Sequence, residues 1–199
     1  MDAARIVGLD IAGVDVVCVD KTGTLTQPGM AVQQLVLLDQ SQPVEAALGA
    51  LGASEPEPNP TLMAVINRWS APDGWTVEAA IPFSSARKWS AATFVEHGSW
   101  VLGAPEMLLP DGDVVRGRAD ELASGGARVI VLGSIPTADL DVERPLVGVQ
   151  PHALVVIDQT LRPDAADTVA YFLEQGVRIR VISGDNAVTV GAIAAQAAA

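Results

Sequence analysis

The stretch VVCVDKTGTLTQPG, residues 16–29, joins an apolar run to a compact polar segment. Residues 14–19 are apolar except at Asp15, and this pattern predicts a short buried strand. The strand ends in Asp20, and residues 21–24 add a lysine, a glycine and two threonines. Because ligands of open parallel sheets bind at the carboxyl ends of the strands, Asp20 is a candidate for chemistry.

The composition is that of a folded protein with room for one large or two small domains. The chain has 199 residues, of which 49% are hydrophobic and 18% charged. A net charge of −12 argues against a nucleic-acid binder, which would present a basic face. The single cysteine, Cys18, excludes a disulfide within the chain and fits a reducing compartment. Its place in an apolar strand predicts a buried, unreactive thiol.

No targeting or membrane segment is evident in the sequence. The first ten residues lack the apolar core of a signal peptide. No apolar run reaches the roughly 18 residues that a membrane helix needs. We therefore expect the chain as given to be soluble.

The middle of the chain, residues 28–150, has the element order of an α+β domain on an antiparallel sheet. Gly98 and Ser99 supply a hairpin turn between two of its strands. The patterns predict strands at 32–38, within 75–102 and at 127–134, and helices at 43–51, 61–69, 104–109 and around 120–124.

The order changes after Pro151 to strand, helix, strand, helix. Residues 152–158 and 177–183 predict strands, and a helix opens near Pro163 and ends at Gly176. Alternation of this kind predicts a parallel sheet with a right-handed crossover. We therefore expect residues 1–27 and 151–199 to form one partial Rossmann-like α/β layer, with residues 28–150 as an inserted domain.

Two strands of the predicted parallel sheet end in polar clusters. One is Asp20 with the residues after it, and the other is Ser183-Gly184-Asp185-Asn186. A carboxylate with hydroxyls, glycine amides and no nearby base suits nucleophilic attack on phosphorus. A Mg²⁺ ion would offset the repulsion between that carboxylate and phosphate.

The segment DKTGTLT, residues 20–26, resembles the phosphorylation signature of P-type ATPases, the cation pumps of the haloacid dehalogenase-like superfamily. Further segments resemble that family in the expected order and together cover most of the chain. They are FSSARK at 83–88, LGAPE at 102–106, GARVIVLG at 126–133 and ISGDN at 182–186.

This resemblance implies a role for each matching residue. Asp20 would accept the γ-phosphoryl group of ATP, and Asp20 with the Thr22 carbonyl would hold Mg²⁺. Phe83 would stack on adenine, and Arg162 would lie near the domain hinge. The residues expected around the phosphate are Lys21, Thr22, Ser183 and Gly184. Those expected at the nucleotide are Phe83, Lys88, Gly103, Arg128 and Asp185.

Several positions depart from related families. Phosphatase relatives carry a second aspartate where this chain has Thr22, so an aspartyl phosphate here should be long-lived. Leu102 replaces the lysine expected before Gly103, which removes a positive contact to ATP. The later lysine, the GDGxND segment, the actuator domain and the membrane helices of the family are absent. We therefore expect this segment alone to be inactive.

The sequence thus predicts the nucleotide-binding and partial phosphorylation domains of a bacterial cation pump. The rest of the pump and ATP would be its partners, with the cation bound outside this chain. The full protein would lie in the cell membrane with this region on the cytoplasmic side. The GAPE element resembles calcium-type pumps. Glu106, His97 and His152 are interpreted as structural.

Two alternatives stay open at this point. One is a Mg²⁺-dependent haloacid dehalogenase-like phosphatase that turns over a small phosphate ester. The other is a nucleotide-binding module that uses the same fold without phosphoryl transfer.

Overall fold

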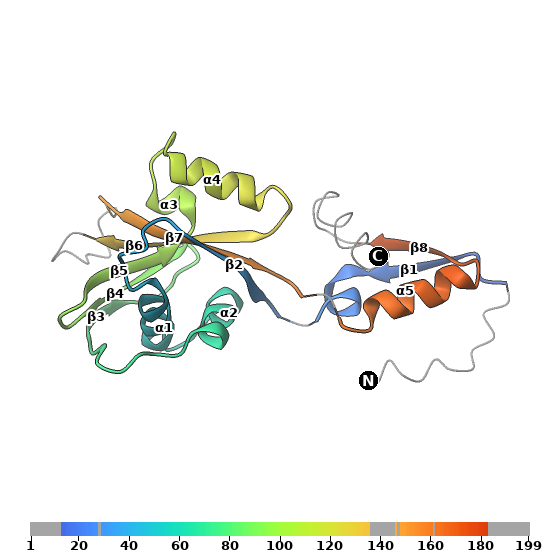
Figure 1. The fold of residues 1–199 in the computed structure, drawn as a ribbon, viewed down its shortest axis with the longest axis horizontal. Coiled ribbons are helices and arrows are strands. Elements are labelled where there is room, and N and C mark those ends of the chain that lie inside the picture. Colours follow the sequence, from blue (N-terminus) through green and yellow to red (C-terminus); the bar gives the residue numbers. More distant parts are fainter. Residues whose placement is uncertain (1–12, 28, 136–145, 147, 161, 183–199) are drawn as a thin grey trace. The chain divides into compact units, whose positions relative to one another are not determined.

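The chain divides into two units, one of which is inserted in the sequence of the other. The computed structural model describes residues 13–27, 29–135, 146, 148–160 and 162–182 (Figure 1). The smaller unit comprises residues 1–27 and 161–199, and the larger unit comprises residues 28–160. In the described ranges no helix has the length and apolar character that a membrane crossing requires.

The smaller unit holds a two-stranded parallel sheet. Strand β1 (Val16–Asp20) pairs with β8 (Arg178–Ile182), with Asp20 opposite Ile182. Helix α5 (Ala165–Glu174) precedes β8 in the chain. Its Val169 packs with Leu25 against Val19, Ile179 and Val181. The parallel pairing expected for these two strands is present.

The other face of this small sheet is exposed in the described part of the chain. Side chains alternate along β8, so Ile179 and Val181 are half-buried while Arg180 is exposed. Cys18 pairs with Arg180 and is exposed as well. The predicted buried strand and buried thiol are therefore wrong. The reason is that α5 covers only one face of the pair.

The larger unit is built on a six-stranded antiparallel sheet with strand order β2-β7-β6-β5-β4-β3. Its strands are β2 (Ala31–Leu37), β3 (Val77–Ile81), β4 (Trp89–Phe94), β5 (Gly98–Gly103), β6 (Arg128–Ile135) and β7 (Gln150–Asp158). Its helices are α1 (Val44–Ser54), α2 (Pro60–Arg68), α3 (Pro105–Leu108) and α4 (Val114–Ala123).

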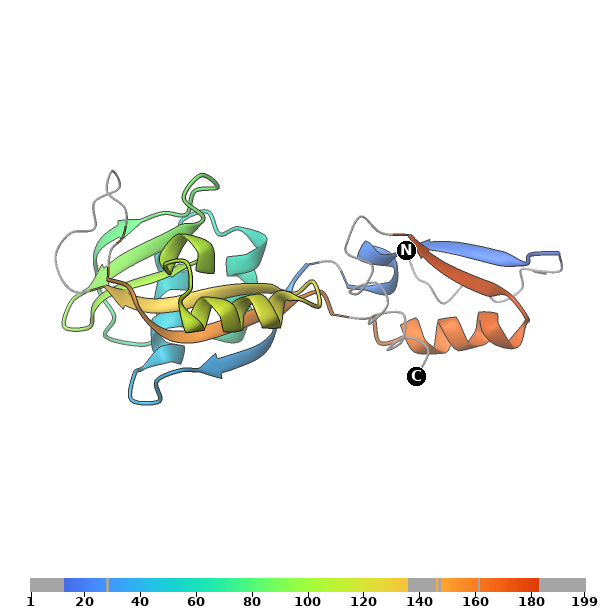
Figure 2. The same cartoon turned by 90° about the horizontal axis from the view of Figure 1, so that it is seen from above.

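Helices cover both faces of this sheet (Figures 1 and 2). On one face, α1 and α2 contribute Leu48 and Val65 to a core that includes Phe94 and Leu132. On the other face, Leu108 of α3 and Ala119 of α4 belong to a second core. A sheet with both faces buried gives its central strands long apolar runs.

Strand β7 corrects the predicted domain organisation. Residues 152–158 were expected in the parallel sheet, but β7 lies between β2 and β6 and is antiparallel to both. Ala153, Val155 and Ile157 face one core, and Leu154 and Val156 face the other. A central strand buried on both faces has the same apolar run as a parallel strand, so the pattern did not distinguish them. Residues 151–160 thus belong to the larger unit.

Candidate functional site

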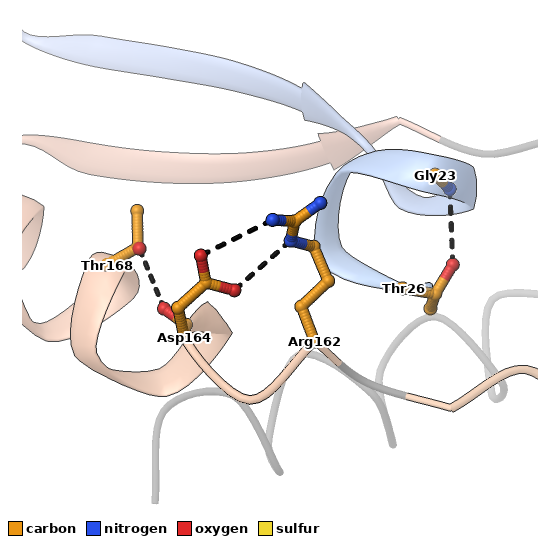
Figure 3. Close-up of polar contacts among 5 residues, drawn as sticks. All are labelled: Gly23, Thr26, Arg162, Asp164 and Thr168. Atoms are coloured by element: carbon orange, nitrogen blue, oxygen red, sulfur yellow. Dashed lines mark hydrogen bonds and ion pairs between the residues drawn. The ribbon is translucent and has the colours of Figure 1, made fainter. Parts of the chain in front are cut away.

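Asp20 lies at the carboxyl end of β1 and is exposed. The next five residues, Lys21–Leu25, form a single π-helical turn, a rare element that often occurs at functional sites. Gly23 in this turn has φ +77°, which glycine adopts without steric cost. Its N–H donates to the hydroxyl of buried Thr26 at 3.2 Å (Figure 3). The turn after Asp20 is therefore held in a defined shape.

Arg162 ties the start of α5 to this turn. Its backbone N–H donates to the Leu25 carbonyl at 2.9 Å. Its guanidinium donates to the Asp164 carboxylate at 3.1 Å, and this bond raises the pKa of Arg162 and lowers the pKa of Asp164 (Figure 3). The Thr168 hydroxyl donates to the Asp164 carbonyl at 2.7 Å. Arg162, expected near a hinge, is the second residue after the boundary between the units.

The larger unit contains a cavity of about 530 Å³. Four residues that the sequence predicts at a nucleotide line it, namely Phe83, Lys88, Gly103 and Arg128. Phe83 and Lys88 lie in the loop between β3 and β4, Gly103 ends β5, and Arg128 begins β6. The fold thus brings together four residues from three separate segments around one cavity.

The loop that carries Phe83 and Lys88 is fixed by hydrogen bonds. The Phe83 N–H donates to the Glu55 carboxylate at 2.8 Å, and the Lys88 N–H donates to the Ser84 carbonyl at 2.7 Å. The Arg87 guanidinium donates to the Pro82 carbonyl at 2.8 Å. Phe83 keeps 36% of its surface exposed. An aromatic face on a fixed loop beside a cavity can stack on a planar ring.

Gly103 is required by a close approach of two strands. It pairs with Trp89, and a Cβ at Gly103 would lie 2.4 Å from the Trp89 Cβ and 2.8 Å from the Lys88 carbonyl oxygen. The neighbouring Leu102 is 4% exposed and adds an apolar wall to the cavity. A side chain at position 103 would therefore clash with β4, and position 102 supplies no charge to the cavity.

Three charged residues line the cavity among those described: Lys88, Arg128 and Glu106. The Lys88 ammonium donates to the Glu106 carboxylate at 3.0 Å. Burial disfavours the charged form of Glu106, but hydrogen bonds from Lys88 and a backbone N–H, with the charges of Lys88 and Arg116, outweigh burial and lower its pKa. Arg128 donates to the Thr61 hydroxyl. Both cations thus already have a protein partner.

Some lining residues were not predicted as part of the site. Asn59, Pro60 and Thr61 lie at the start of α2, where the Asn59 side chain accepts from the Leu62 N–H. Their sequence indicates a helix start, and nothing local indicates that this start faces a cavity. Glu106 was predicted to be structural; it lines the cavity and accepts a hydrogen bond from Lys88.

The remaining predicted residues do not belong to the described lining of this cavity. Asp20 and the turn that contains Lys21 and Thr22 belong to the smaller unit. Ser183, Gly184 and Asp185 lie outside the described residues. Within the described ranges, no group of three or more histidine, cysteine or acidic residues is arranged to hold a metal.

The family model for haloacid dehalogenase-like hydrolases matches residues 14–199. The chain belongs to this family. The match includes both the Asp20 turn and the larger unit, so this haloacid dehalogenase-like chain carries its cavity within an insertion between β1 and α5.

Relatives of this haloacid dehalogenase-like chain include named pumps. It is 45% identical over 188 residues to the calcium-transporting ATPase CtpE of Mycolicibacterium smegmatis, covering 94% of this chain and 23% of that protein. It is 38% identical over 192 residues to the protein named "Probable cation-transporting ATPase exp7" of Streptococcus pneumoniae, covering 94% of this chain and 24% of that protein. The chain therefore spans about a quarter of the length of these relatives.

A solved structure shares the fold. The crystal structure of a zinc-transporting PIB-type ATPase matches with a TM-score of 0.69 over 92% of this chain and 28% of that chain. Identity is 22%, so this likeness concerns the fold alone. The fold class expected from the sequence, a small parallel sheet with an inserted antiparallel α+β domain, is confirmed.

Proposed function

We propose that this chain is the ATP-binding and phosphoryl-accepting part of a cation-transporting P-type ATPase. One observation carries the proposal. Phe83, Lys88, Gly103 and Arg128, which the family resemblance assigns to the nucleotide, line one cavity although they lie in three separate segments. A site of this size and mixed lining suits a nucleotide.

Within this cavity each residue has a contribution that follows from its chemistry. The exposed ring of Phe83 stacks on adenine. Lys88 and Arg128 donate to phosphate oxygens, and such charge-assisted bonds are about twice as strong as neutral ones. Gly103 lies in the cavity lining and contributes the backbone of β5 to it.

Asp20 is the proposed phosphoryl acceptor. One of its carboxylate oxygens attacks the γ-phosphorus of ATP, the bond from that phosphorus to the bridging oxygen breaks, and ADP leaves. The turn follows the acceptor directly in the chain and contains backbone amides of the kind that bind phosphoryl oxygens. Thr22 stands where a phosphatase would carry an acid or base, so the acyl phosphate resists hydrolysis.

Magnesium fits the oxygen donors available at Asp20. The exposed carboxylate and the Thr22 carbonyl are hard ligands, and Mg²⁺ commonly binds proteins through one or two carboxylates plus phosphate oxygens. When bound, the ion would neutralise charge on the phosphates. Lys21, Ser183, Gly184 and Asp185 are proposed to complete the phosphate and nucleotide contacts.

The remainder of the function is proposed from the relatives. The first relative named above transports calcium, and we propose calcium for this protein as well. The remainder of a pump, with its membrane helices, would then bind the cation, and this region would face the cytoplasm.

An NMR titration with ATP tests the nucleotide site. We expect saturable shifts in residues 83–88 and near Arg128, and weaker binding by Phe83→Ala. Tyr171→Ala is the matched control, since Tyr171 is an exposed aromatic residue on α5 of the smaller unit. No shifts at millimolar ATP, or equal losses in both variants, would contradict the proposal.

Labelling from γ-labelled ATP tests the phosphoryl acceptor in a pump-length protein. We expect a label that is stable in acid, labile in base and absent in Asp20→Asn. Turnover of a small phosphate ester without an initial burst, lost in Asp20→Asn, would favour a phosphatase instead.

A further inference from the structure

The cavity of the larger unit has a built-in counter-ion for one of its two cations. Lys88 and Glu106 both line the cavity, and the ammonium-to-carboxylate distance is 3.0 Å. Their side chains are 54% and 45% exposed. The negative charge of Glu106 would repel the phosphates of a nucleotide bound in this cavity. The position of this carboxylate therefore calls for an explanation.

The backbone holds these two residues together. Lys88 precedes β4 and has φ +57°, a left-handed conformation that is uncommon for residues other than glycine. Its carbonyl accepts from the Ala104 N–H at 3.0 Å, and Glu106 lies two residues further on, in the first turn of α3. The pair is therefore set by the pairing of β4 with β5 and not by a chance meeting of long side chains.

The other charges around the cavity do not offset this carboxylate. Arg128 donates to Thr61, and position 102 carries a buried leucine. Lys88, Arg128 and Glu106 together leave the described lining with a formal charge of only +1. The local charge is thus low for a site that would bind a polyanion.

We propose that Glu106 competes with the nucleotide phosphates for Lys88 and so sets how strongly the site prefers ligands of higher negative charge. This inference rests on the proposed ATP site. An exposed ion pair contributes little to stability, so an anionic ligand can displace the carboxylate at small cost. The freed ammonium then donates to a phosphate oxygen. The nucleotide therefore binds more weakly than it would to Lys88 and Arg128 without the negative charge of Glu106.

Calorimetric titration of the full chain with adenosine, AMP, ADP and ATP tests this inference. Glu106→Gln should lower the dissociation constant of ATP by about threefold to tenfold at low salt, of ADP by less, and of uncharged adenosine not at all. The gain should shrink as salt is raised. Glu78→Gln is the matched control, because it removes the same charge from an exposed position on β3 that does not line the cavity.

A second pair of variants tests whether Lys88 is the point of competition. In a Lys88→Gln background, Glu106→Gln should bring a smaller gain in ATP affinity than it does with Lys88 present. Equal ATP affinity in Glu106→Gln and the unchanged chain would overturn the inference, as would weaker ATP binding or a gain that extends to adenosine. If the NMR titration of the unchanged chain showed no ATP binding near Phe83, the proposed nucleotide site itself would be wrong. This inference, which rests on that site, would then be wrong as well.

Discussion

Single residues decide how closely the strands that frame the cavity can approach. Gly103 is an example, because its missing side chain leaves room for the Trp89 and Lys88 backbone. The sequence showed this glycine within a family-like segment, LGAPE, and so indicated a nucleotide contact. It could not indicate the packing reason, because the close approach depends on the pairing of two strands.

Opposite effects are expected at two glycines. Gly103→Ala should destabilise the larger unit by about 1–3 kcal/mol, since backbone atoms have to move. Gly117→Ala should stabilise it by about 0.5–1 kcal/mol, because Gly117 lies inside α4 and, apart from its chain neighbours and the nearby backbone of that helix, no atom lies within 4 Å of where the methyl group would be. Urea denaturation of both variants measures the difference. A stabilising Gly103→Ala would contradict the close approach.

A substitution at Leu102 would place a charge in the wall of the cavity. Leu102→Lys should tighten ATP binding several-fold by adding a cation, and it should cost about 1–3 kcal/mol of unfolding free energy because a buried leucine is lost. Leu102→Met keeps the apolar character and is the control. Titration calorimetry and denaturation measure the two effects. Unchanged affinity in Leu102→Lys would show that position 102 does not face the phosphates.

At the scale of helices and strands, the apolar pattern predicted where a strand lies better than it predicted which strands it pairs with. Residues 152–158 read as a strand from their apolar run, and β7 is that strand. Its neighbours could not be predicted, because both a parallel sheet and the centre of an antiparallel sheet bury such a run. Helix α4 begins at Val114, ahead of the predicted stretch around 120–124. Its start follows Asp113, whose side chain accepts from two backbone N–H groups, while a mostly exposed helix shows little apolar periodicity.

The histidine on β7 should make the stability of the larger unit depend on pH. His152 is 5% exposed, and its Nε2 lies 2.8 Å from the Ser134 hydroxyl. Burial lowers its pKa from 6.5, although the Asp39 carboxylate partly offsets this. Below pH 6.5 the unfolded chain therefore takes up a proton that the folded protein resists. The unfolding free energy should fall as pH decreases from 6.5 towards the lower folded-state pKa.

Urea denaturation between about pH 5.5 and 7.5 measures this dependence. His152→Gln should remove the slope, whereas His97→Gln should keep it. His97 stacks on Trp75 with ring centroids 4.2 Å apart and is the matched histidine control. A slope that survives in His152→Gln and disappears in His97→Gln would contradict the assignment.

At the scale of the whole molecule, the larger unit is continuous in sequence and the smaller one is not. A polypeptide of residues 28–160 should fold alone and bind ATP within about twofold of the full chain, because its core and cavity lie inside it. A polypeptide of residues 28–149 should fail to fold, since it lacks the central strand β7. Circular dichroism and calorimetry compare the two. A folded shorter polypeptide would contradict the central position of β7.

The pairing of Ala31 with Asp158 has a consequence for how the whole chain folds. Directly paired residues of antiparallel strands have Cα atoms about 5 Å apart, so the folded larger unit leaves its two ends side by side. The smaller unit draws on segments separated by roughly 130 residues. Once the insertion has folded, closing that gap costs no more entropy than closing a loop of a few residues, a saving of about 3 kcal/mol. The inserted unit should therefore fold first and hold the two segments of the smaller unit together. A mutation that unfolds the larger unit should then also destabilise the smaller unit, although the mutated residue lies outside it.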